Sequence, residues 1–256
     1  MHIFNHSNVE ILRQIDYNLI IEEKIRFILK TLTKGGFHMK LMLYHGTKTK
    51  NLIPIYGKGR HENDYGQGFY TSEDLTLAKE WAWSPFTQGE TGYVYKYSLD
   101  LSNLKVLNFN DHDTLSWLAE LLVNRRLNIG EHEEVLKDRV EAVIKKFRIP
   151  NIEEYDVIIG WRADDSYFAY MEDFVQGTIY RDVFDQAIKL GDLGEQVFIK
   201  SETAFKALQL ISIKEVPKYY EKLYDERDKL ARSSYKLIRE DNINRSRDKK
   251  TIDYYL

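Results

Sequence analysis

The chain has 256 residues, of which 43% are hydrophobic and 30% charged, and its formal net charge is −3. This composition predicts a globular protein with a sizeable core, and it gives no overall basic field that would attract nucleic acid. The absence of cysteine excludes disulfides and thiolate metal sites. No apolar run is long enough to predict a membrane span, so we expect a cytoplasmic protein with no membrane partner.

The first predicted element is a helix over residues 8–32, where apolar residues recur at intervals of three and four. Gly35 and Gly36 end it as a C-cap and hinge. We therefore divide the chain into three parts. They are an N-terminal helical appendage at residues 1–38, a main domain at residues 39–212 and a charged helical C-terminal tail at residues 213–256.

The main domain contains short β-rich segments and amphipathic helical segments in irregular order. The predicted strands are residues 41–44, 69–70, 93–99, 155–160 and 196–199. The predicted helices are residues 75–83, 115–127, 134–147, 172–190 with a break at Gly177, and 201–208. This order predicts an α+β fold rather than a doubly wound sheet. No G-x-G-x-x-G lies between a strand and a helix, which argues against a Rossmann site.

The segment Tyr44-His45-Gly46-Thr47 follows the first predicted strand. A neutral imidazole offers one donor and one acceptor, which suits a ribose hydroxyl. Gly46 lets a ligand approach the backbone closely. A lone histidine at a strand end is more often structural, so this motif needs support from others.

A glycine-rich segment at residues 64–71 leads into the helix that holds Trp81. Gly66 and Gly68 permit a tight turn beside a ligand. Tyr70 and Trp81 are eleven residues apart, one at a strand end and one on the helix. Such a pair can hold a flat ring, because base–aromatic stacking contributes about 1–3 kcal/mol. The alternative is that Trp81 belongs to the core.

The strand near the end of the main domain begins with Glu195 and Gln196. A polar group there either projects into a cleft or forms the solvated end of the strand. Adjacent side chains on a strand face opposite ways, so only one of the two can enter a cleft.

Two further carboxylates, Asp164 and Asp165, follow another predicted strand. They could face an acceptor molecule, and a surface turn explains them equally well. We expect no metal site, since no His-rich spacing accompanies them.

Together the His-Gly-Thr, Gly-Gln-Gly-Phe-Tyr and Glu-Gln segments resemble the three motifs of the diphtheria-toxin-like ADP-ribosyltransferases, which include the poly(ADP-ribose) polymerases. Among bacterial families the chain is most similar to the one called DUF3990, over roughly residues 41–210. The last match is imperfect, because Phe198 follows Gln196 by two positions rather than three. The segments that carry this similarity are residues 44–47, 66–82, 156–165 and 196–208.

The resemblance implies a split antiparallel β-sheet core flanked by helices, with an NAD cleft between its halves. By similarity, His45 would bond a ribose, Tyr70 would stack on the nicotinamide and Trp81 would lie behind it. The implied NAD-binding residues are His45, Gly46, Thr47, Gly68, Tyr70 and Trp81.

Two candidates remain for the catalytic position. Cleaving the bond to nicotinamide leaves an oxocarbenium-like centre, which a polar group near the 2′-hydroxyl stabilises. In the polymerases this group is a glutamate. A Leu-x-Glu alignment selects Glu195, whereas alignment with DUF3990 selects Gln196, which we favour. A glutamine would bond the ribose but carry no charge, which favours mono-transfer over polymer synthesis.

We therefore expect an NAD-dependent mono-ADP-ribosyltransferase that modifies an intracellular protein or nucleic acid, as a bacterial toxin or defence factor. NAD would be the co-substrate, without a metal. The appendage could bind an inhibitor or antitoxin partner. The alternatives are an NAD- or ADP-ribose-binding module without turnover and an interaction protein with a vestigial cleft.

Overall fold

The computed structural model describes residues 39–125, 133–163, 165–190, 194–245 and 249–256. The helix predicted at residues 8–32 and the carboxylate of Asp164 lie outside the described residues. Residues 41–256 form one compact unit. This unit includes the charged tail, and the boundary expected at residues 212 and 213 falls inside a strand.

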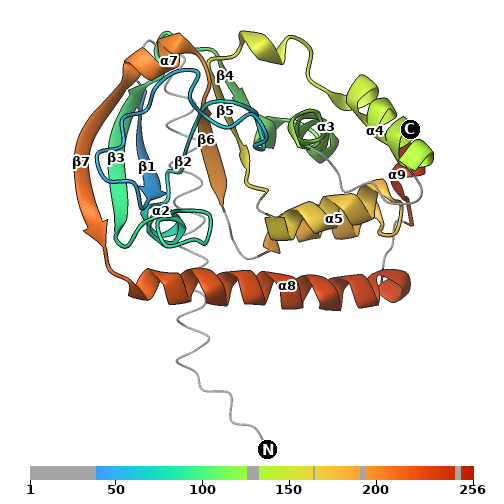
Figure 1. Ribbon diagram of the computed structural model, residues 1–256. Coiled ribbons are helices and arrows are strands. Elements are labelled where there is room, and N and C mark those ends of the chain that lie inside the picture. The colour runs from blue at the N-terminus through green and yellow to red at the C-terminus, as the bar shows by residue number, and fades with distance from the viewer. Residues whose placement is uncertain (1–38, 126–132, 164, 191–193, 246–248) are drawn as a thin grey trace, which may run out of the picture. The chain divides into compact units, whose positions relative to one another are not determined.

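Two small β-sheets form the framework of residues 41–256 (Figure 1). The three-stranded sheet has the order β1-β3-β7, with β1 at Lys40–Thr47, β3 at Gly92–Asp100 and β7 at Leu208–Val216. The four-stranded sheet has the order β2-β6-β5-β4, with β2 at Phe69–Thr71, β6 at Glu195–Ile199, β5 at Val157–Trp161 and β4 at Val106–Asn108. With the helices below, they confirm the predicted α+β class.

The two sheets meet at a single bridge between Tyr44 and Ser72. The Tyr44 amide donates to the Ser72 carbonyl at 2.7 Å, and the Ser72 amide donates to the Tyr44 carbonyl at 2.9 Å. The bridge is isolated, so no ladder of β1 with β2 follows it among the described residues. The segment His45-Gly46-Thr47 therefore lies at a split between sheets.

One pair of strands departs from the expected split antiparallel sheet. β4 and β5 are parallel, with Val106 opposite Val157. Parallel neighbours need a long crossover connection. The chain makes it through α3 (Thr114–Asn124) and α4 (Glu133–Phe147), which the sequence predicted as two amphipathic helices.

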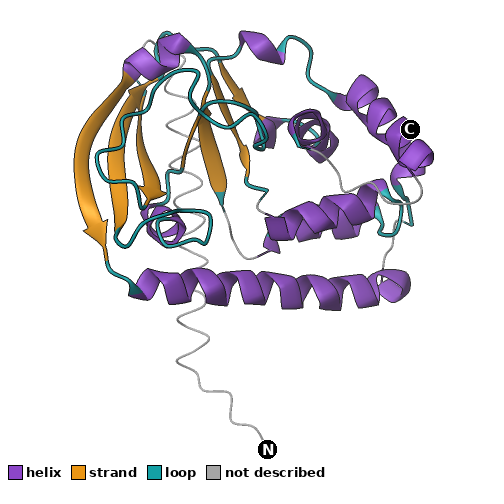
Figure 2. Cartoon of the chain, in the orientation of Figure 1, coloured by secondary structure: helices purple, strands orange, loops and turns teal. Residues whose placement is uncertain are grey.

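The largest core cluster joins the four-stranded sheet to its helices. Figure 2 shows these helices beside the sheet. It includes Trp117, Phe174 and Phe198, each fully buried. The helical region predicted over residues 172–190 forms two helices, α5 (Asp165–Val175) and α6 (Arg181–Ala187). Shorter elements complete the framework: the 3-10 helices η2 (Phe109–Asp111) and η3 (Ile152–Glu154), α7 (Glu202–Ala207) and α9 (Ile252–Tyr255).

Helix α2 (Leu75–Trp81) follows β2 directly. Its N-cap is Asp74, whose carboxylate accepts from the amides of Thr76 and Leu77. Thr71, three residues earlier, is still in β2, and its Oγ1 donates to the Val197 carbonyl at 2.8 Å.

The long helix α8 (Tyr219–Arg245) runs below α2 and α5 in Figure 1. Arg227 of α8 makes a two-pronged ion pair with Glu80 of α2, at 2.7 and 2.9 Å, and the Glu80 side chain is only 4% exposed. Tyr235 donates to Asp173 of α5 at 2.6 Å. The tail therefore packs on α2 and α5. Among the described helices, none combines the length and apolar character that a membrane crossing requires.

Candidate functional site

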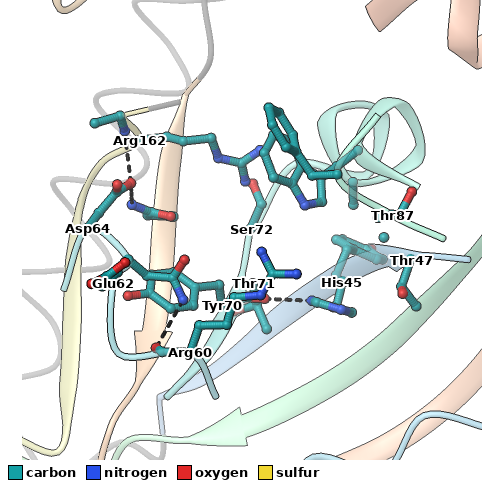
Figure 3. Close-up of a pocket in the computed structure, with 18 of the residues that line it drawn as sticks. His45, Thr47, Arg60, Glu62, Asp64, Tyr70, Thr71, Ser72, Thr87 and Arg162 are labelled. Atoms are coloured by element: carbon teal, nitrogen blue, oxygen red, sulfur yellow. Dashed lines mark hydrogen bonds between the residues drawn. The ribbon is translucent and has the colours of Figure 1, made fainter. Parts of the chain in front are cut away.

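A cavity of about 520 Å³ opens where β1, β2 and β6 approach α2 (Figure 3). This volume is typical of small-molecule sites. The lining combines aromatic rings, backbone at the sheet split and charged side chains. It consists of Tyr44, His45, Gly46, Thr47, Arg60, Glu62, Asn63, Asp64, Tyr70, Thr71, Ser72, Ala78, Trp81, Phe86, Thr87, Arg125, Arg162, Ala163 and Gln196.

His45 is half-buried at the end of β1, and its Nδ1 lies 2.7 Å from the Tyr70 carbonyl oxygen (Figure 3). A carbonyl can only accept, so Nδ1 carries the proton and Nε2 is left as an acceptor. Burial lowers the pKa of His45 to about 4, so the ring is neutral at ordinary pH. A neutral ring with one open acceptor can receive a ligand hydroxyl.

Gly46 and Thr47 form the buried floor beside His45. A Cβ on Gly46 would overlap the carbonyl of Ala78, so glycine allows α2 to pack against β1. Thr47 Oγ1 accepts from the Thr49 amide at 3.1 Å, which holds the loop that follows.

Tyr70 lines the cavity from β2, and its hydroxyl is hydrogen-bonded to the backbone of the glycine-rich turn. The hydroxyl donates to the Gly66 carbonyl at 2.7 Å and accepts from the Tyr65 amide at 3.0 Å. The Tyr70 ring packs on Phe198 with centroids 4.7 Å apart. Burial also raises the pKa of Tyr70 far above its usual range. The ring is thus a fixed flat surface rather than a proton donor or base.

Trp81 also lines the cavity, from the last turn of α2. The Arg162 guanidinium lies 4.9 Å from its ring centroid. Phe86 stacks on it at 5.9 Å, and Tyr224 of α8 meets it edge-on at 6.2 Å. Trp81 is therefore both a wall of the cavity and part of the packing between α2 and α8.

The structure separates the two candidates for the catalytic position. Gln196 is 3% exposed and lines the cavity. Glu195 points away from it, and its Oε1 accepts from Asn110 Nδ2 at 2.7 Å on the exposed side of the sheet. Gln196 alone belongs to the cavity, as strand alternation requires.

Gly68 does not line the cavity, unlike the other residues expected to bind NAD. A Cβ there would overlap the ring of Phe198 and lie 2.5 Å from the carbonyl of Ile199. Close packing against β6 leaves no room for a side chain at position 68. This close packing explains why position 68 is a glycine.

Asp64 is a site residue that the sequence did not single out. It is 6% exposed, and its carboxylate accepts from Arg125 at 3.0 Å, from the Ala163 amide at 2.9 Å and from Gln196 Nε2 at 2.7 Å. Burial raises the pKa of Asp64, while the Arg125 charge and these donors oppose that rise. In the sequence, the one feature that points to Asp64 is its place immediately before the glycine-rich turn. The residues that it hydrogen-bonds lie about 60 to 130 positions away, so no local pattern reveals them.

Charged side chains at the cavity include three arginines and two carboxylates, so positive charges exceed negative ones by one. Arg60 and Arg162 enter the cavity from opposite sides (Figure 3). Arg125 is engaged by Asp64 and by the Ala163 carbonyl. Within the described part of the chain, no group of three or more His, Asp or Glu side chains could hold a metal ion. The cavity therefore suits an anionic organic ligand.

Comparison with known families gives one match. The model of a family described as a protein of unknown function, DUF3990, matches residues 41–210. A search of curated proteins and a search of solved structures each found no match. The matched range contains every residue that lines the cavity, and it ends within β7, before α8 begins.

Proposed function

The chain belongs to the DUF3990 family, and we propose that it binds NAD in the cavity at the sheet split and transfers a single ADP-ribose to a macromolecular acceptor. The observation that carries the proposal is that segments more than 100 residues apart bring His45, Tyr70, Trp81 and Gln196 to one cavity. These are the residues that the resemblance to ADP-ribosyltransferases selects. The split of the two sheets at the Tyr44–Ser72 bridge supports an ADP-ribosyltransferase-like fold.

In this proposal the nicotinamide mononucleotide half of NAD lies over β1 and β2. The neutral ring of His45 accepts a ribose hydroxyl at Nε2, while its Nδ1 is held by the Tyr70 carbonyl. The fixed face of Tyr70 stacks on the nicotinamide, with Trp81 as the facing wall. The backbone at Gly46 meets the carboxamide, since glycine leaves the backbone accessible.

In the same proposal, the diphosphate and adenosine extend toward the cavity arginines. A diphosphate carries two negative charges, and guanidinium groups bind phosphate oxygens in a fork geometry. Arg60 and Arg162 are the cavity arginines placed on opposite sides of this space (Figure 3). The excess of positive charge in the cavity favours a ligand of this kind.

The reaction breaks the bond between the ribose C1′ and the nicotinamide nitrogen, and the electron pair leaves on nicotinamide. A nucleophile of the acceptor forms a bond to C1′ and releases its proton. Gln196, at the wall of the cavity, bonds the ribose as positive charge develops on the sugar. An uncharged amide stabilises that charge less than a carboxylate does, which agrees with a single transfer.

The proposal is tested by calorimetric titration with NAD and by chromatography of released nicotinamide, with the full chain and with cell lysate as acceptor source. We expect binding with a Kd below about 1 mM, the ordinary range for enzyme substrates. We also expect radiolabel from the adenylate of NAD to become attached to a macromolecule. Mass spectrometry of the labelled product identifies the acceptor, and growth arrest on expression would support a toxin or defence role. Absence of both label transfer and nicotinamide release contradicts the enzyme proposal.

One observation favours a second candidate, an NAD- or ADP-ribose-binding module without turnover. Gln196 is uncharged and already hydrogen-bonded to Asp64. A module of this kind binds NAD in the titration and quenches Trp81 fluorescence, yet releases no nicotinamide above the spontaneous rate. The same two measurements therefore separate the candidates.

A further inference from the structure

Asp64 and Gln196 form a buried pair at the wall of the cavity. Gln196 Nε2 donates to Asp64 Oδ2 at 2.7 Å and to the Trp161 carbonyl at 3.2 Å. Asp64 lies before the glycine-rich turn and Gln196 on β6, and both line the cavity. Their exposed fractions are 6% and 3%, so the contact is shielded from bulk water.

These contacts determine which atom of the Gln196 amide a ligand can meet. A side-chain amide has two N–H donors on nitrogen and two lone pairs on oxygen. Asp64 and Trp161 take both donors. The atom left to interact with a ligand is Oε1, an acceptor. Gln196 is thus held in the orientation in which it resembles one oxygen of a carboxylate.

The contacts of Asp64 are those of an ionised carboxylate. Oδ1 accepts from Arg125, and Oδ2 accepts from the Ala163 amide and from Gln196. A structural ion pair with Arg125 would use Oδ1 alone. The second oxygen, Oδ2, instead holds the Gln196 amide and the backbone amide of Ala163, which follows β5.

We propose that Asp64 is a positioning residue for Gln196, and that it places directly behind the amide the negative charge that a catalytic glutamate would carry itself. This inference rests on the proposed function and extends it. Asp64 polarises the amide through a short hydrogen bond, which makes Oε1 a better acceptor for a ribose hydroxyl. The Asp64–Gln196 pair carries a charge of −1, as one glutamate would, and Arg125 is paired with Oδ1, the oxygen of Asp64 that does not contact Gln196.

The test uses Asp64→Asn, Gln196→Glu and the double variant that exchanges the two groups. Asp64→Asn presents an amide where Gln196 needs an acceptor, so Gln196 loses its orientation. Gln196→Glu brings a second carboxylate into contact with Asp64. In the double variant the new amide at position 64 donates to the new carboxylate at position 196, and the pair keeps its charge with the carboxylate moved to the ribose side. The control is Asp113→Asn, which breaks the ion pair of the exposed Asp113 with Arg181, and neither residue lines the cavity.

We expect Asp64→Asn to lower kcat for nicotinamide release by about 100-fold, as loss of one preorganised electrostatic group does. KM for NAD should change by less than about threefold, because the group acts on charge that develops in the transition state. Gln196→Glu should lose at least as much. The double variant should regain at least about tenfold over either single variant, a coupling expected of residues in contact.

Additive losses in the double variant would overturn the inference, and so would wild-type kcat in Asp64→Asn with activity retained in the control. If the unmodified chain binds no NAD and releases no nicotinamide, the proposed function fails and the role toward ribose fails with it. The orienting contact between Asp64 and Gln196 is then tested by the melting temperatures of the variants alone. Recovery of stability in the double variant supports the orienting contact, and additive destabilisation refutes it.

Discussion

At the scale of single residues, the site depends on which way neighbouring side chains face and which proton each group holds. Gln196 enters the cavity because β6 pairs with β5 in the register that sets Gln196 opposite Gly160. Glu195, opposite Trp161, is turned to Asn110. This difference of one position separates a residue with access to a ligand from one without it.

Replacing these neighbours one at a time tests that assignment. We expect Gln196→Ala to lower nicotinamide release by about 100-fold, because it removes the polar group beside the ribose. Glu195→Ala should leave it within about twofold of the unmodified chain, since the Glu195 carboxylate bonds Asn110 outside the cavity. The measurement is kcat from chromatographic assay of nicotinamide. Equal losses in the two variants would contradict the assignment.

The low pKa of His45 predicts how the stability of the folded chain depends on pH. This pKa is about 4 in the folded chain and about 6.5 when unfolded. Between these values the unfolded state binds more protons, so stability falls as pH drops through this window, and His45 contributes nothing above it. The integrated effect is on the order of 3 kcal/mol.

Urea denaturation at several pH values measures this effect, and His45→Gln should lose less stability than the unmodified chain between pH 6.5 and 4. Parallel curves for the two proteins would mean that His45 titrates normally. NAD affinity should stay constant from pH 6.5 to 8, where the His45 ring is neutral in both free and bound protein.

At the scale of elements, α8 supports the wall of the cavity through α2. Glu80 of α2 is buried and its charge is satisfied by Arg227 of α8, while Tyr224 contacts Trp81. The tail therefore contacts Trp81, a residue that lines the cavity.

Arg227→Met should destabilise the chain by about 3 kcal/mol, because it leaves the Glu80 carboxylate buried and unpaired. The Glu80→Met/Arg227→Met double variant should recover most of that loss, since two apolar chains replace the pair. Arg232→Met is the matched control, because its ion pair with Asp228 is exposed and should contribute less than about 1 kcal/mol. Unfolding free energies from urea titration provide the comparison. A double variant as unstable as Arg227→Met would show that Glu80 does not need its partner.

At the scale of the whole molecule, the family match ends before the structural unit does. The matched range stops at residue 210, whereas β7 continues to Val216 and residues 41–256 form one compact unit. Val216 itself is buried and pairs with Gly92 of β3.

A chain truncated after residue 210 should therefore not unfold cooperatively. It loses most of the β7 pairing with β3 and uncovers the apolar surfaces of α2 and α5. Thermal denaturation followed by circular dichroism should show a broad transition in place of a sharp one. A sharp transition within about 5 °C of the full chain would show that the tail is dispensable for folding.

The sequence by itself determined the elements with strong local signals. The predicted strands at β1, β2, β3, β5 and β6 are confirmed, as are the two amphipathic helices α3 and α4, because periodicity and turn residues act over a few positions. Two strands were missed. β4 has only three residues, and most of β7 is exposed, so it is held by pairing with β3 rather than by a buried face.

Only the tertiary structure decided how the site is assembled. The motifs at His45 and Tyr70 were visible as short patterns, but Asp64 matters through Gln196 and Arg125, which are distant in sequence. The parallel pairing of β4 and β5, the removal of Gly68 from the cavity and the choice of Gln196 over Glu195 also depend on contacts across the fold. Local patterns set the backbone conformation of each segment, whereas burial, register and charge pairing arise only when distant segments meet.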